Sequence, residues 1–333
     1  MVSMKDIAAE CGVSIAAVSK ALNGSKDIGN ETREKIKQVA EQMGYHPNFS
    51  ARALKTKKSY NIGVLYNESS GSGLMHNYFA QILDSFKNVA ESKGYDITFL
   101  SNSKTRKDQM SYLAHALHRG MDGVIIAVAD YNDEEVAELL QSDLPVVTID
   151  YMYEGRISVI SNNIKGMECL MSYIFEKGHR KIAYIYGDES MVTEDRVSVY
   201  YRFHEKNKIK INDNYIVKGK YRDSYIAGVI TNKLLDLPEP PDCIIYADDF
   251  AAIGGMNVIK NRGMKIPQDI SIAGYDGIIM ATQLEPPLTT YRQNTKQIGS
   301  IAAKELINLI ENSKSTKIRQ YVVEGELVKG ASV

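Results

Sequence analysis

Cysteine is scarce in this chain and tryptophan is absent: three of the 333 residues are cysteine. Cys11, Cys169 and Cys243 lie far apart and lack the short spacing of metal-ligand pairs, so the sequence indicates neither a disulfide framework nor a zinc site. A chain with so few cysteines is typical of a reducing compartment.

Long apolar runs are missing as well. No stretch approaches the roughly 20 apolar residues that a membrane-spanning helix needs. The first residues, Met1-Val2-Ser3-Met4-Lys5-Asp6, do not have the apolar run of a signal peptide. We therefore expect a soluble, cytoplasmic protein with no membrane partner.

An excess of charge of one sign is also lacking, because 40 basic residues stand against 41 acidic ones and the net charge is −1. Residues 1–58, however, hold ten basic and six acidic side chains, which leaves this segment at +4 and the remainder at −5. Such asymmetry suggests a basic surface for nucleic acid, although an ordinary solvated surface explains the charge equally well. Sequence motifs must decide between the two.

The first sixty residues predict three short helices joined by tight turns. The first covers residues 4–11 and is broken by Gly12, Ser14 is the expected N-cap of the second, and Asn30 is the expected N-cap of a third that ends at Gly44. The expected inward positions are Ile7, Ala8, Cys11, Val18, Ala21, Leu22, Ile36, Val39, Ala40 and Met43. This pattern predicts a helix-turn-helix unit.

Several runs in this segment are more specific than helix spacing. They are Lys5-Asp6-Ile7-Ala8, Gly12-Val13-Ser14, Val18-Ser19-Lys20-Ala21-Leu22-Asn23-Gly24, Thr32-Arg33-Glu34-Lys35 and Gly44-Tyr45-His46-Pro47-Asn48. Together they resemble the DNA-binding signature of the lactose-repressor (LacI/GalR) family. The resemblance implies a sequence-specific DNA-binding transcriptional regulator, a repressor of carbohydrate-utilisation genes under allosteric control by a small sugar-like effector, with double-stranded operator DNA as its partner.

By that resemblance the second helix reads DNA in the major groove. Ile15, Ala16 and Lys20 occupy the positions that contact base edges. Lys20 can donate to guanine O6 and N7, although it lacks the planar fork of arginine, while Ile15 and Ala16 offer apolar contact to a thymine methyl group. The remaining expected DNA contacts are Ser14, Ser19, Asn23, Tyr45, Asn48, Arg52 and Leu54.

The run Pro47-Asn48-Phe49-Ser50-Ala51-Arg52-Ala53-Leu54-Lys55 resembles the hinge helix of the same family. A helix this short is below the roughly 12–15 residues at which isolated helices become marginal in water. We therefore expect it to order only on DNA and beside a partner hinge, so that folding is linked to binding. The resemblance implies that Leu54 wedges into a minor-groove step and kinks the duplex.

Beyond residue 60 the sequence alternates short β-rich runs with amphipathic helices. The expected strands cover residues 61–66, 95–100, 123–128, 145–149, 181–186, 215–218, 243–246 and 270–273. The expected helices lie near residues 78–93, 107–119, 133–141, 164–177, 193–208, 224–235 and 250–262. This repetition predicts parallel sheets covered by helices on both faces, in two similar halves that follow one another along the chain.

The family resemblance continues through this core. Its further matches are Ser161-Asn162-Asn163-Ile164-Lys165-Gly166, Lys177-Gly178-His179-Arg180-Lys181-Ile182-Ala183, Ile272-Ala273-Gly274-Tyr275-Asp276 and Pro286-Pro287-Leu288-Thr289-Thr290-Tyr291-Arg292-Gln293. The expected fold class is α/β: an all-α helix-turn-helix domain (1–46), a hinge helix and linker (47–60), and a periplasmic-binding-protein-like core of two doubly wound parallel-sheet subdomains (61–333). We expect a homodimer held through the cores, since a pseudo-palindromic operator requires two-fold symmetry.

Candidate effector residues follow the expected strands, where ligands bind in open α/β sheets. The residues that match family ligand contacts are Phe79, Asp150, Arg196, Tyr221, Asp248 and Asp276. The aromatic rings offer flat faces to a sugar, the carboxylates accept from hydroxyl groups and Arg196 donates. Three acids against one Arg favour a neutral sugar over an anionic ligand. Arg180 and Lys181 are the other cations of this part of the sequence, and they do not reverse that preference.

This sequence departs from the family pattern at three places. Asp248 stands where Asn is usual and so has no donor, Gly277 replaces a frequent Asp, and Val199 replaces a frequent Gly. These departures leave the identity of the effector open. Whether the effector weakens or strengthens DNA binding is open as well. The answer depends on which of two conformations of the core, the one that binds DNA or the one that does not, has the higher affinity for the effector.

An enzyme and a secreted sugar-binding protein are the alternatives. Nothing in the sequence has the pattern of a nucleophile with its base or of a metal-ligand set, and the histidines are scattered, so we expect no enzyme activity, no cofactor and no metal. The secreted alternative does not explain residues 4–55. Gly71-Ser72-Gly73 lacks the spacing of a nucleotide-binding loop and is interpreted as a loop at the mouth of an effector cleft.

Overall fold

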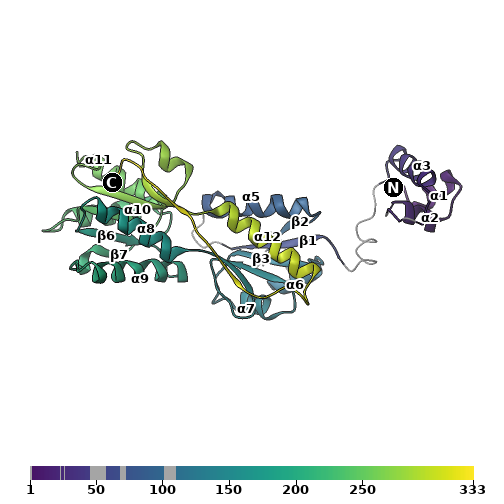
Figure 1. Cartoon of the computed structure of the whole chain (residues 1–333), viewed down its shortest axis with the longest axis horizontal. Helices are drawn as coiled ribbons and strands as arrows, with labels where there is room; N and C mark the ends of the chain where they lie inside the picture. The colour runs from purple at the N-terminus through teal and green to yellow at the C-terminus, as the bar shows by residue number, and fades with distance from the viewer. Residues whose placement is uncertain (1, 23, 26, 46–57, 68–72, 101–109) are drawn as a thin grey trace. The chain divides into compact units, whose positions relative to one another are not determined.

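The computed structural model describes residues 2–22, 24–25, 27–45, 58–67, 73–100 and 110–333. Two compact units divide the chain, Met1–Ser59 and Tyr60–Val333 (Figure 1). Among the described residues, no helix has both the length and the apolar character needed to cross a membrane.

The described residues of the first unit form three helices: α1 (Met4–Cys11), α2 (Ile15–Leu22) and α3 (Asn30–Gln42). They enclose a small core in which the buried side chains are Ile7, Ala8, Cys11, Val18, Ala21, Ile36 and Ala40. Leu22, Val39 and Met43 pack against this core and are only partly buried. The predicted helices and their inward faces are therefore confirmed.

The helix ends in this unit follow local rules, with one correction. Ser3 and Asp6 form a capping box at the start of α1, and Gly12 ends it with φ 70°. The prediction that Asn30 caps α3 was wrong: Gly29 is the N-cap and Asn30 is the first helical residue. The Asn30 side chain instead accepts a hydrogen bond from Arg33.

The second unit has two lobes. The first, here called the N-lobe (residues 60–161 and 295–323), contains a parallel sheet with the strand order β11-β5-β4-β3-β1-β2. Its strands are β1 (Asn61–Tyr66), β2 (Asp96–Leu100), β3 (Gly123–Val128), β4 (Val146–Ile149), β5 (Ile157–Ser161) and β11 (Gln320–Val323). Its helices are η1 (Gly73–Met75), α5 (Asn77–Ser92), α6 (Tyr112–His118), α7 (Glu134–Gln141) and α12 (Thr295–Glu311).

The other lobe, the C-lobe (residues 162–292 and 326–333), repeats this plan with the order β12-β10-β9-β8-β6-β7. Its strands are β6 (Ile182–Tyr186), β7 (Ile216–Lys218), β8 (Cys243–Tyr246), β9 (Ser271–Asp276), β10 (Thr289–Arg292) and β12 (Glu326–Val328), and only β12 runs antiparallel to its neighbour. Its helices are α8 (Asn163–Glu176), η2 (Asp213–Tyr215), α9 (Met191–Lys206), α10 (Ser224–Leu235), α11 (Asp249–Asn261) and η3 (Ile279–Gln283).

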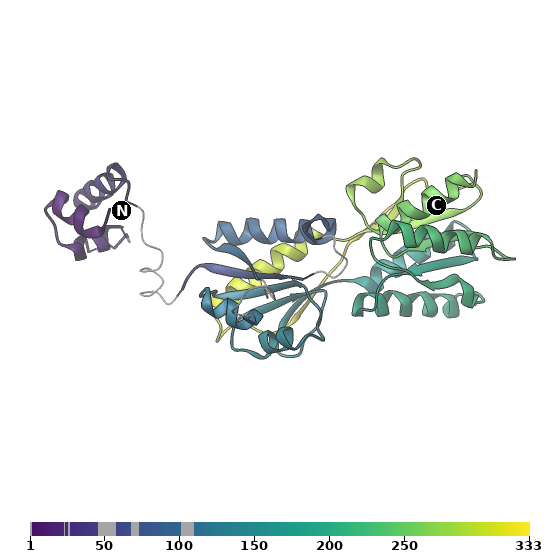
Figure 2. The ribbon, with the colours of Figure 1, turned by 180° about the vertical axis from the view of Figure 1, so that it is seen from behind.

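The two lobes are not consecutive halves of the chain, so that prediction was wrong. The chain passes between them after β5, after β10 and after β11. The returning helix α12 packs beside α5 in the N-lobe, as the yellow and blue helices in Figures 1 and 2 show. Strands β5, β10, β11 and β12 and helix α12 were absent from the prediction.

Each sheet separates two apolar cores, because successive side chains of a strand point to opposite faces. Ile125 packs with α5 and α12 on one face of the N-lobe sheet, and its neighbour Ile126 packs with α6 and α7 on the other. Ile244 and Ile245 alternate in the same way in the C-lobe. The inner strands are thus buried on both faces, as helix-covered parallel sheets require.

Candidate functional site

The outer face of α2 consists of the residues expected to contact DNA. Ser14, Ile15, Ala16 and Lys20 are exposed, whereas Val18 on the inner face is buried. Ile15 keeps 50% of its surface accessible, which a core role would not allow. Ser14 Oγ accepts from the backbone N–H of Ala17 at 3.1 Å and so caps the helix.

The other predicted DNA contacts differ in accessibility. Lys20 Nζ lies 3.1 Å from Asp27 Oδ2 in an exposed ion pair that a base contact would have to replace. Ser19 is half-buried, and Tyr45 is half-buried against the helix-turn-helix core. The predicted contacts Asn23, Asn48, Arg52 and Leu54 lie outside the described residues.

A second group of predicted residues gathers where the two lobes face each other. Asp150 directly follows β4, Asp276 ends β9, Asp248 follows β8 and Tyr221 lies beyond β7. These positions belong to the carboxyl ends of parallel strands. We call the set of Asp150, Arg196, Tyr221, Asp248, Tyr275 and Asp276 the interlobe cluster.

Arg196, on α9, is the cation of this cluster, and it is only 3% exposed. Its Nε donates to Asn163 Oδ1 at 2.9 Å, and its Nη1 donates to the carbonyl oxygen of Ala247 at 3.1 Å. Its guanidinium carbon lies 3.5 Å from the centre of the Tyr275 ring. These contacts use only part of the five guanidinium donors, so others are available to a bound molecule.

The carboxylates around Arg196 are protonated more easily than free ones. Burial raises the pKa of Asp276 to about 7, against the lowering effect of Arg196 and with a further rise from Asp248. Burial likewise raises the pKa of Asp150, although Tyr78, Ser161 and Arg196 oppose it. The cluster therefore carries less negative charge near neutral pH than its three acids suggest.

Asp248 has a structural role in addition to its predicted one. It is the N-cap of α11, where its Oδ1 accepts from the backbone N–H of Ala251 at 2.8 Å. Its Oδ2 accepts from the backbone N–H of Arg222 at 2.6 Å. Any contact of Asp248 with a bound molecule must therefore use the second lone pair of an oxygen that is already hydrogen-bonded.

Aromatic side chains form the N-lobe side of this region. Phe79 is half-buried and packs edge-on against Tyr66, His76 and Tyr78, with ring centres 6.0, 4.8 and 5.0 Å away. The Tyr78 hydroxyl donates to Asp150 Oδ2 at 2.5 Å, which connects the aromatic group to the acid of the same lobe.

Tyr221 supplies the aromatic ring of the C-lobe. Its hydroxyl lies 2.8 Å from Thr193 Oγ1, and a Cβ atom at Gly187 would come within 2.2 Å of its ring. Glycine is thus required at residue 187 for the ring to occupy this position.

The structure adds residues that the sequence reasoning missed. Asn163 and Tyr275 both contact Arg196, Tyr78 binds Asp150, and Gln293 Nε2 donates to Asp276 Oδ1 at 2.7 Å. All but Tyr78 stand within runs that carried the family resemblance. Their position in those runs is the feature of the sequence that could have identified them as site residues.

A cavity of about 640 Å³ lies beside the interlobe cluster, along the crossing segments after β10 and β11. Its lining includes Gln293, Thr295, Lys296 and Glu324, but none of the six predicted effector residues is among the lining residues. The predicted effector residues therefore contact one another and their polar neighbours, and they do not line this cavity.

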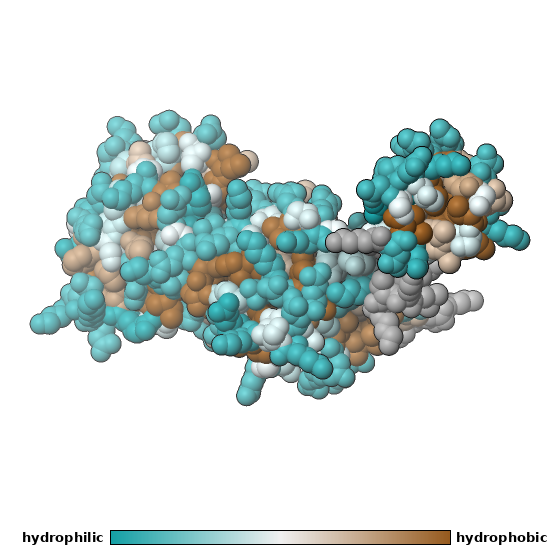
Figure 3. All heavy atoms as spheres, turned by 45° about the vertical axis from the view of Figure 1, so that its right-hand side comes forward, coloured by the Kyte–Doolittle hydropathy of each residue, from teal (hydrophilic) through white to brown (hydrophobic). Residues whose placement is uncertain are grey.

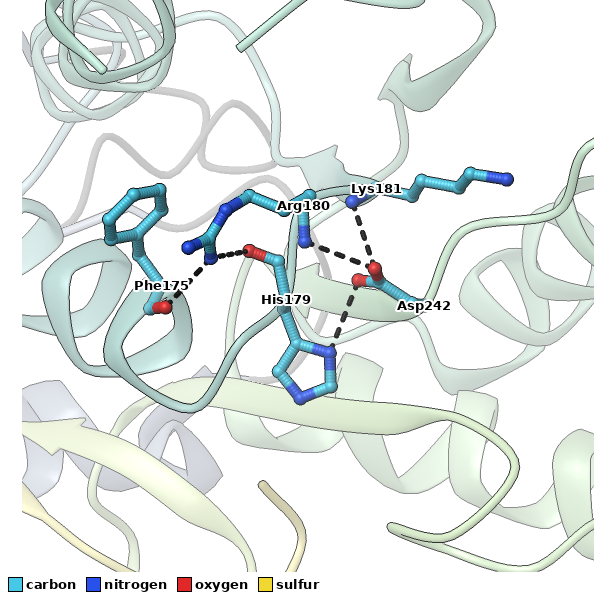
Figure 4. A network of polar contacts seen from close by, with 5 residues as sticks. All are labelled: Phe175, His179, Arg180, Lys181 and Asp242. Atoms are coloured by element: carbon cyan, nitrogen blue, oxygen red, sulfur yellow. Dashed lines mark hydrogen bonds and ion pairs between the residues drawn. The ribbon is translucent and has the colours of Figure 1, made fainter. Parts of the chain in front are cut away.

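Arg180 and Lys181 lie away from the cluster. They immediately precede β6, at its amino end, and both backbone N–H groups donate to Asp242 Oδ2 at 3.0 Å (Figure 4). The Arg180 guanidinium stacks on Phe175, 3.6 Å from the ring centre. His179 Nδ1 completes the network at 3.2 Å from Asp242, so this run of the sequence stabilises one end of the sheet.

Metal binding has no support in the part of the chain that the structure describes, which contains no group of three or more His, Cys, Asp or Glu side chains placed to hold an ion. His115 and His118 stand in the last turn of α6, one turn apart.

The geometry defines a helix-turn-helix unit followed in the chain by a two-lobed core of the periplasmic-binding-protein type. The family model described as "Bacterial regulatory proteins, lacI family" matches residues 3–48, and the one described as "Periplasmic binding protein-like domain" matches residues 171–333.

Relatives match over the whole length. The chain is 31% identical to a Bacillus subtilis protein named "Probable HTH-type transcriptional repressor ExuR", over 100% of this chain and 98% of the relative. It is 28% identical to the "HTH-type transcriptional repressor PurR" of Vibrio atlanticus and to the "Ribose operon repressor" of Haemophilus influenzae, in both cases over 100% of this chain and 99% of the relative. This protein therefore belongs to the LacI family of bacterial regulatory proteins, which act as DNA-binding transcriptional regulators with an effector-binding core.

Solved structures agree on the fold. The lac repressor dimer bound to operator and the anti-inducer ONPF superposes with a TM-score of 0.83 at 24% identity, covering 99% of this chain and 98% of that one. The transcriptional regulator CelR in complex with cellobiose gives a TM-score of 0.71 at 22% identity over all of both chains. At these identities the likeness concerns the fold alone.

Proposed function

We propose that this protein is a cytoplasmic, homodimeric repressor of carbohydrate-utilisation genes whose affinity for DNA changes when a small neutral sugar binds between the lobes. The observation that carries the effector proposal is the interlobe cluster, which combines a buried guanidinium, three carboxyl groups and flat aromatic faces. Directional polar groups beside aromatic rings are what a polyhydroxylated ligand requires.

The charge of the cluster supports a neutral ligand. Arg196 is surrounded by Asp150, Asp248 and Asp276, and the basic run at Arg180 and Lys181 lies at the other end of its sheet. Arg222 is a second cation beside Asp248, so among the described residues two cations stand against three carboxyl groups at the cluster and do not outnumber them. Two of the similar proteins, the ribose operon repressor and CelR with cellobiose, carry sugars in their names.

Calorimetry against a panel of neutral mono- and disaccharides tests the effector proposal. Binding should weaken at least tenfold in Arg196→Ala and Asp276→Ala, whereas Arg262→Ala, whose guanidinium pairs with Asp236 at the surface, is the matched control. Hypoxanthine and an amino-acid mixture form the comparison arms. Tight binding of a purine, or sugar binding that both substitutions leave intact, would overturn the sugar assignment.

The proposed DNA contacts are the exposed face of α2 and the hinge residues. Lys20→Ala should relax the preference among operator variants at a cost of about 1–3 kcal/mol if Lys20 contacts a base. Leu54→Ala should weaken operator binding more than binding to random DNA, since a wedge acts only where the duplex is kinked. Equal losses on both DNAs for both variants would contradict these roles.

We also propose that the chain consists of a helix-turn-helix domain (1–46), a hinge helix with its linker (47–60) and a core (61–333). The dimer forms through the core. Large apolar side chains remain exposed on the core, among them Tyr225 at 77%, Ile279 at 74% and, on the edge strand β2, Phe99 at 44%. Figure 3 shows apolar patches between the hydrophilic side chains of one face. Exposed apolar surface and an open sheet edge favour association. Sedimentation should show a dimer, and a strictly monomeric species at micromolar concentration would count against it.

A further inference from the structure

Arg222 connects the two lobes through a hydrogen bond of its side chain. It lies in the C-lobe, between Tyr221 and the N-cap of α10, yet its Nη2 lies 3.3 Å from the carbonyl oxygen of Met75 in the N-lobe. These two residues are separated by 147 positions in the sequence. The bond therefore joins the two lobes directly.

The Arg222 backbone is held in an unusual conformation. Its φ of +58° is in the left-handed region, which is unfavourable for a residue with a Cβ atom. Its N–H donates to Asp248 Oδ2 at 2.6 Å, and the next residue, Asp223, caps α10. Both neighbouring interactions fix the direction in which the side chain leaves the loop. Strain that the surroundings maintain in this way often has a functional reason.

The side chain is positioned as firmly as the backbone. Its guanidinium carbon lies 4.3 Å from the centre of the Phe250 ring on α11, an arrangement that favours a planar cation. On the opposite lobe, Met75 ends η1, and the Tyr66 hydroxyl donates to the carbonyl oxygen of Gly73 at 2.7 Å in the same short helix. Donor and acceptor are thus each supported by their own lobe.

The surroundings of this bond connect it to the aromatic group of the N-lobe. His76 follows Met75 directly and packs edge-on against Phe79. Burial and the positive charge of Arg222 lower the pKa of His76 to about 4. The imidazole is therefore neutral near pH 7 and does not repel the guanidinium.

We propose that Arg222 is a positioning residue that holds the two lobes together across the interlobe cluster, through its bond to the Met75 carbonyl, before any effector is present. Its contribution sets the ratio of closed to open core, and with it the affinity for an effector that binds the closed form. The significance for effector affinity rests on the proposed function, but the contribution to lobe closure does not.

Distances between spin labels on the two lobes test this directly, without effector and without DNA. Labels at Gln141→Cys on α7 and Glu205→Cys on α9 occupy exposed positions, one on each lobe. The partly exposed Cys169 is replaced by Ser in every sample, and the other two cysteines are buried.

Arg222→Ala should shift the distance distribution toward the open form and lower the closed-to-open ratio roughly threefold to tenfold, the effect of losing one hydrogen bond. Arg222→Lys should give an intermediate shift, because the ammonium group keeps a donor but lacks the planar face. Arg222→Lys also serves as the test variant if Arg222→Ala folds poorly. Two controls should keep the original distribution: Arg262→Ala, and Met75→Ala, which removes a side chain that is 75% exposed and leaves the carbonyl acceptor in place.

The proposal is overturned if Arg222→Ala and Arg222→Lys both retain the distribution of the unsubstituted protein, or if Arg262→Ala shifts it as far. A failure of the sugar panel would leave this measurement unaffected, since it contains no ligand. A shift without any sugar binding would support the role of Arg222 in closure and count only against the sugar assignment.

Discussion

The two lobes of the core share a strand order but not a chemistry. The N-lobe order β2-β1-β3-β4-β5-β11 is repeated as β7-β6-β8-β9-β10-β12, and both place residues at the carboxyl ends of their strands. Both lobes supply aromatic rings there, but the N-lobe adds one acid, whereas the C-lobe adds the buried cation and two acids. Topology fixes where residues meet, and the side chains at those positions determine what each lobe offers.

The C-lobe should be the more sensitive to a single substitution. Arg196→Met removes the cation from among buried carboxyl groups and leaves Asn163 Oδ1 without its donor. Breaking one partner of such a set costs about 3–5 kcal/mol, measured as the free energy of unfolding of the core in urea. Arg262→Met breaks only the exposed pair with Asp236 and should cost less than about 1 kcal/mol. Equal losses would mean that the buried guanidinium is not essential to the cluster.

The acid of the C-lobe should give stability a distinctive pH dependence. Asp276 has a pKa near 7 in the folded protein against an ordinary value of 3.8, so the folded state holds a proton that the unfolded state has lost. Stability from this group is therefore greatest at low pH and falls as the pH rises from about 4 through about 7.

Asp276→Asn should remove that dependence, because the amide resembles the protonated carboxyl and still accepts from Gln293. Since one pKa unit corresponds to about 1.4 kcal/mol and the pKa of Asp276 rises from 3.8 to about 7, the variant should exceed the unsubstituted protein by roughly 4 kcal/mol near pH 8 and by little near pH 4. Urea unfolding at both pH values makes the comparison. A constant difference at both would contradict the raised pKa.

The N-lobe should respond less strongly. Tyr78→Phe deletes the hydroxyl that donates to Asp150 Oδ2 and leaves that oxygen without this donor, at a cost of about 1–2 kcal/mol in the free energy of unfolding. Tyr95→Phe is a matched control, since its hydroxyl lies 3.4 Å from Glu311 in a longer bond. A smaller loss for Tyr78→Phe than for Tyr95→Phe would reverse this expectation.

The amino end of the C-lobe sheet should be the least sensitive. Lys181→Ala removes an exposed amino group 3.8 Å from Glu239 but keeps the backbone N–H that Asp242 binds. The unfolding free energy should change by less than about 0.5 kcal/mol, and effector affinity should not change. A measurable loss of effector affinity would show that the chemistry of this lobe is not confined to the carboxyl ends of its strands.

The sequence predicted the local elements well, because the signals for them are local. The strands at Asn61–Tyr66, Gly123–Val128 and Cys243–Tyr246 and the helix at Ser224–Leu235 have the bounds that their apolar patterns indicated. By contrast, β5 (Ile157–Ser161) buries two serines among its apolar residues and is weakly marked as a strand.

Local apolar patterns could not predict that the chain returns to the N-lobe. Helix α12 carries a clear apolar face, with Ile298, Ala302 and Leu306 buried, so the helix itself was open to prediction. Its position beside α5 depends on close backbone approach: a Cβ atom at Gly299 would lie 2.2 Å from the carbonyl oxygen of Ile82. Such a contact between distant residues leaves no periodic pattern in the sequence.

The same division applies to the candidate site. Asp150, Asp248 and Asp276 follow strands and could be located from the strand pattern alone. The partners of Arg196 could not, because Asn163 and Tyr275 reach it from two other elements, α8 and β9. Which of these side chains contact an effector stays a prediction.

The path of the chain between the lobes has a consequence for the synthesis of the protein. The N-lobe lacks α12 and the edge strand β11 until residues 295–323 have been added, and the C-lobe lacks β12 for slightly longer. The helix-turn-helix unit, whose core lies wholly within its own helices, is complete as soon as α3 has left the ribosome. A nascent chain that stops before residue 295 therefore has a complete helix-turn-helix unit but neither lobe complete, and the core acquires its fold only near the end of translation.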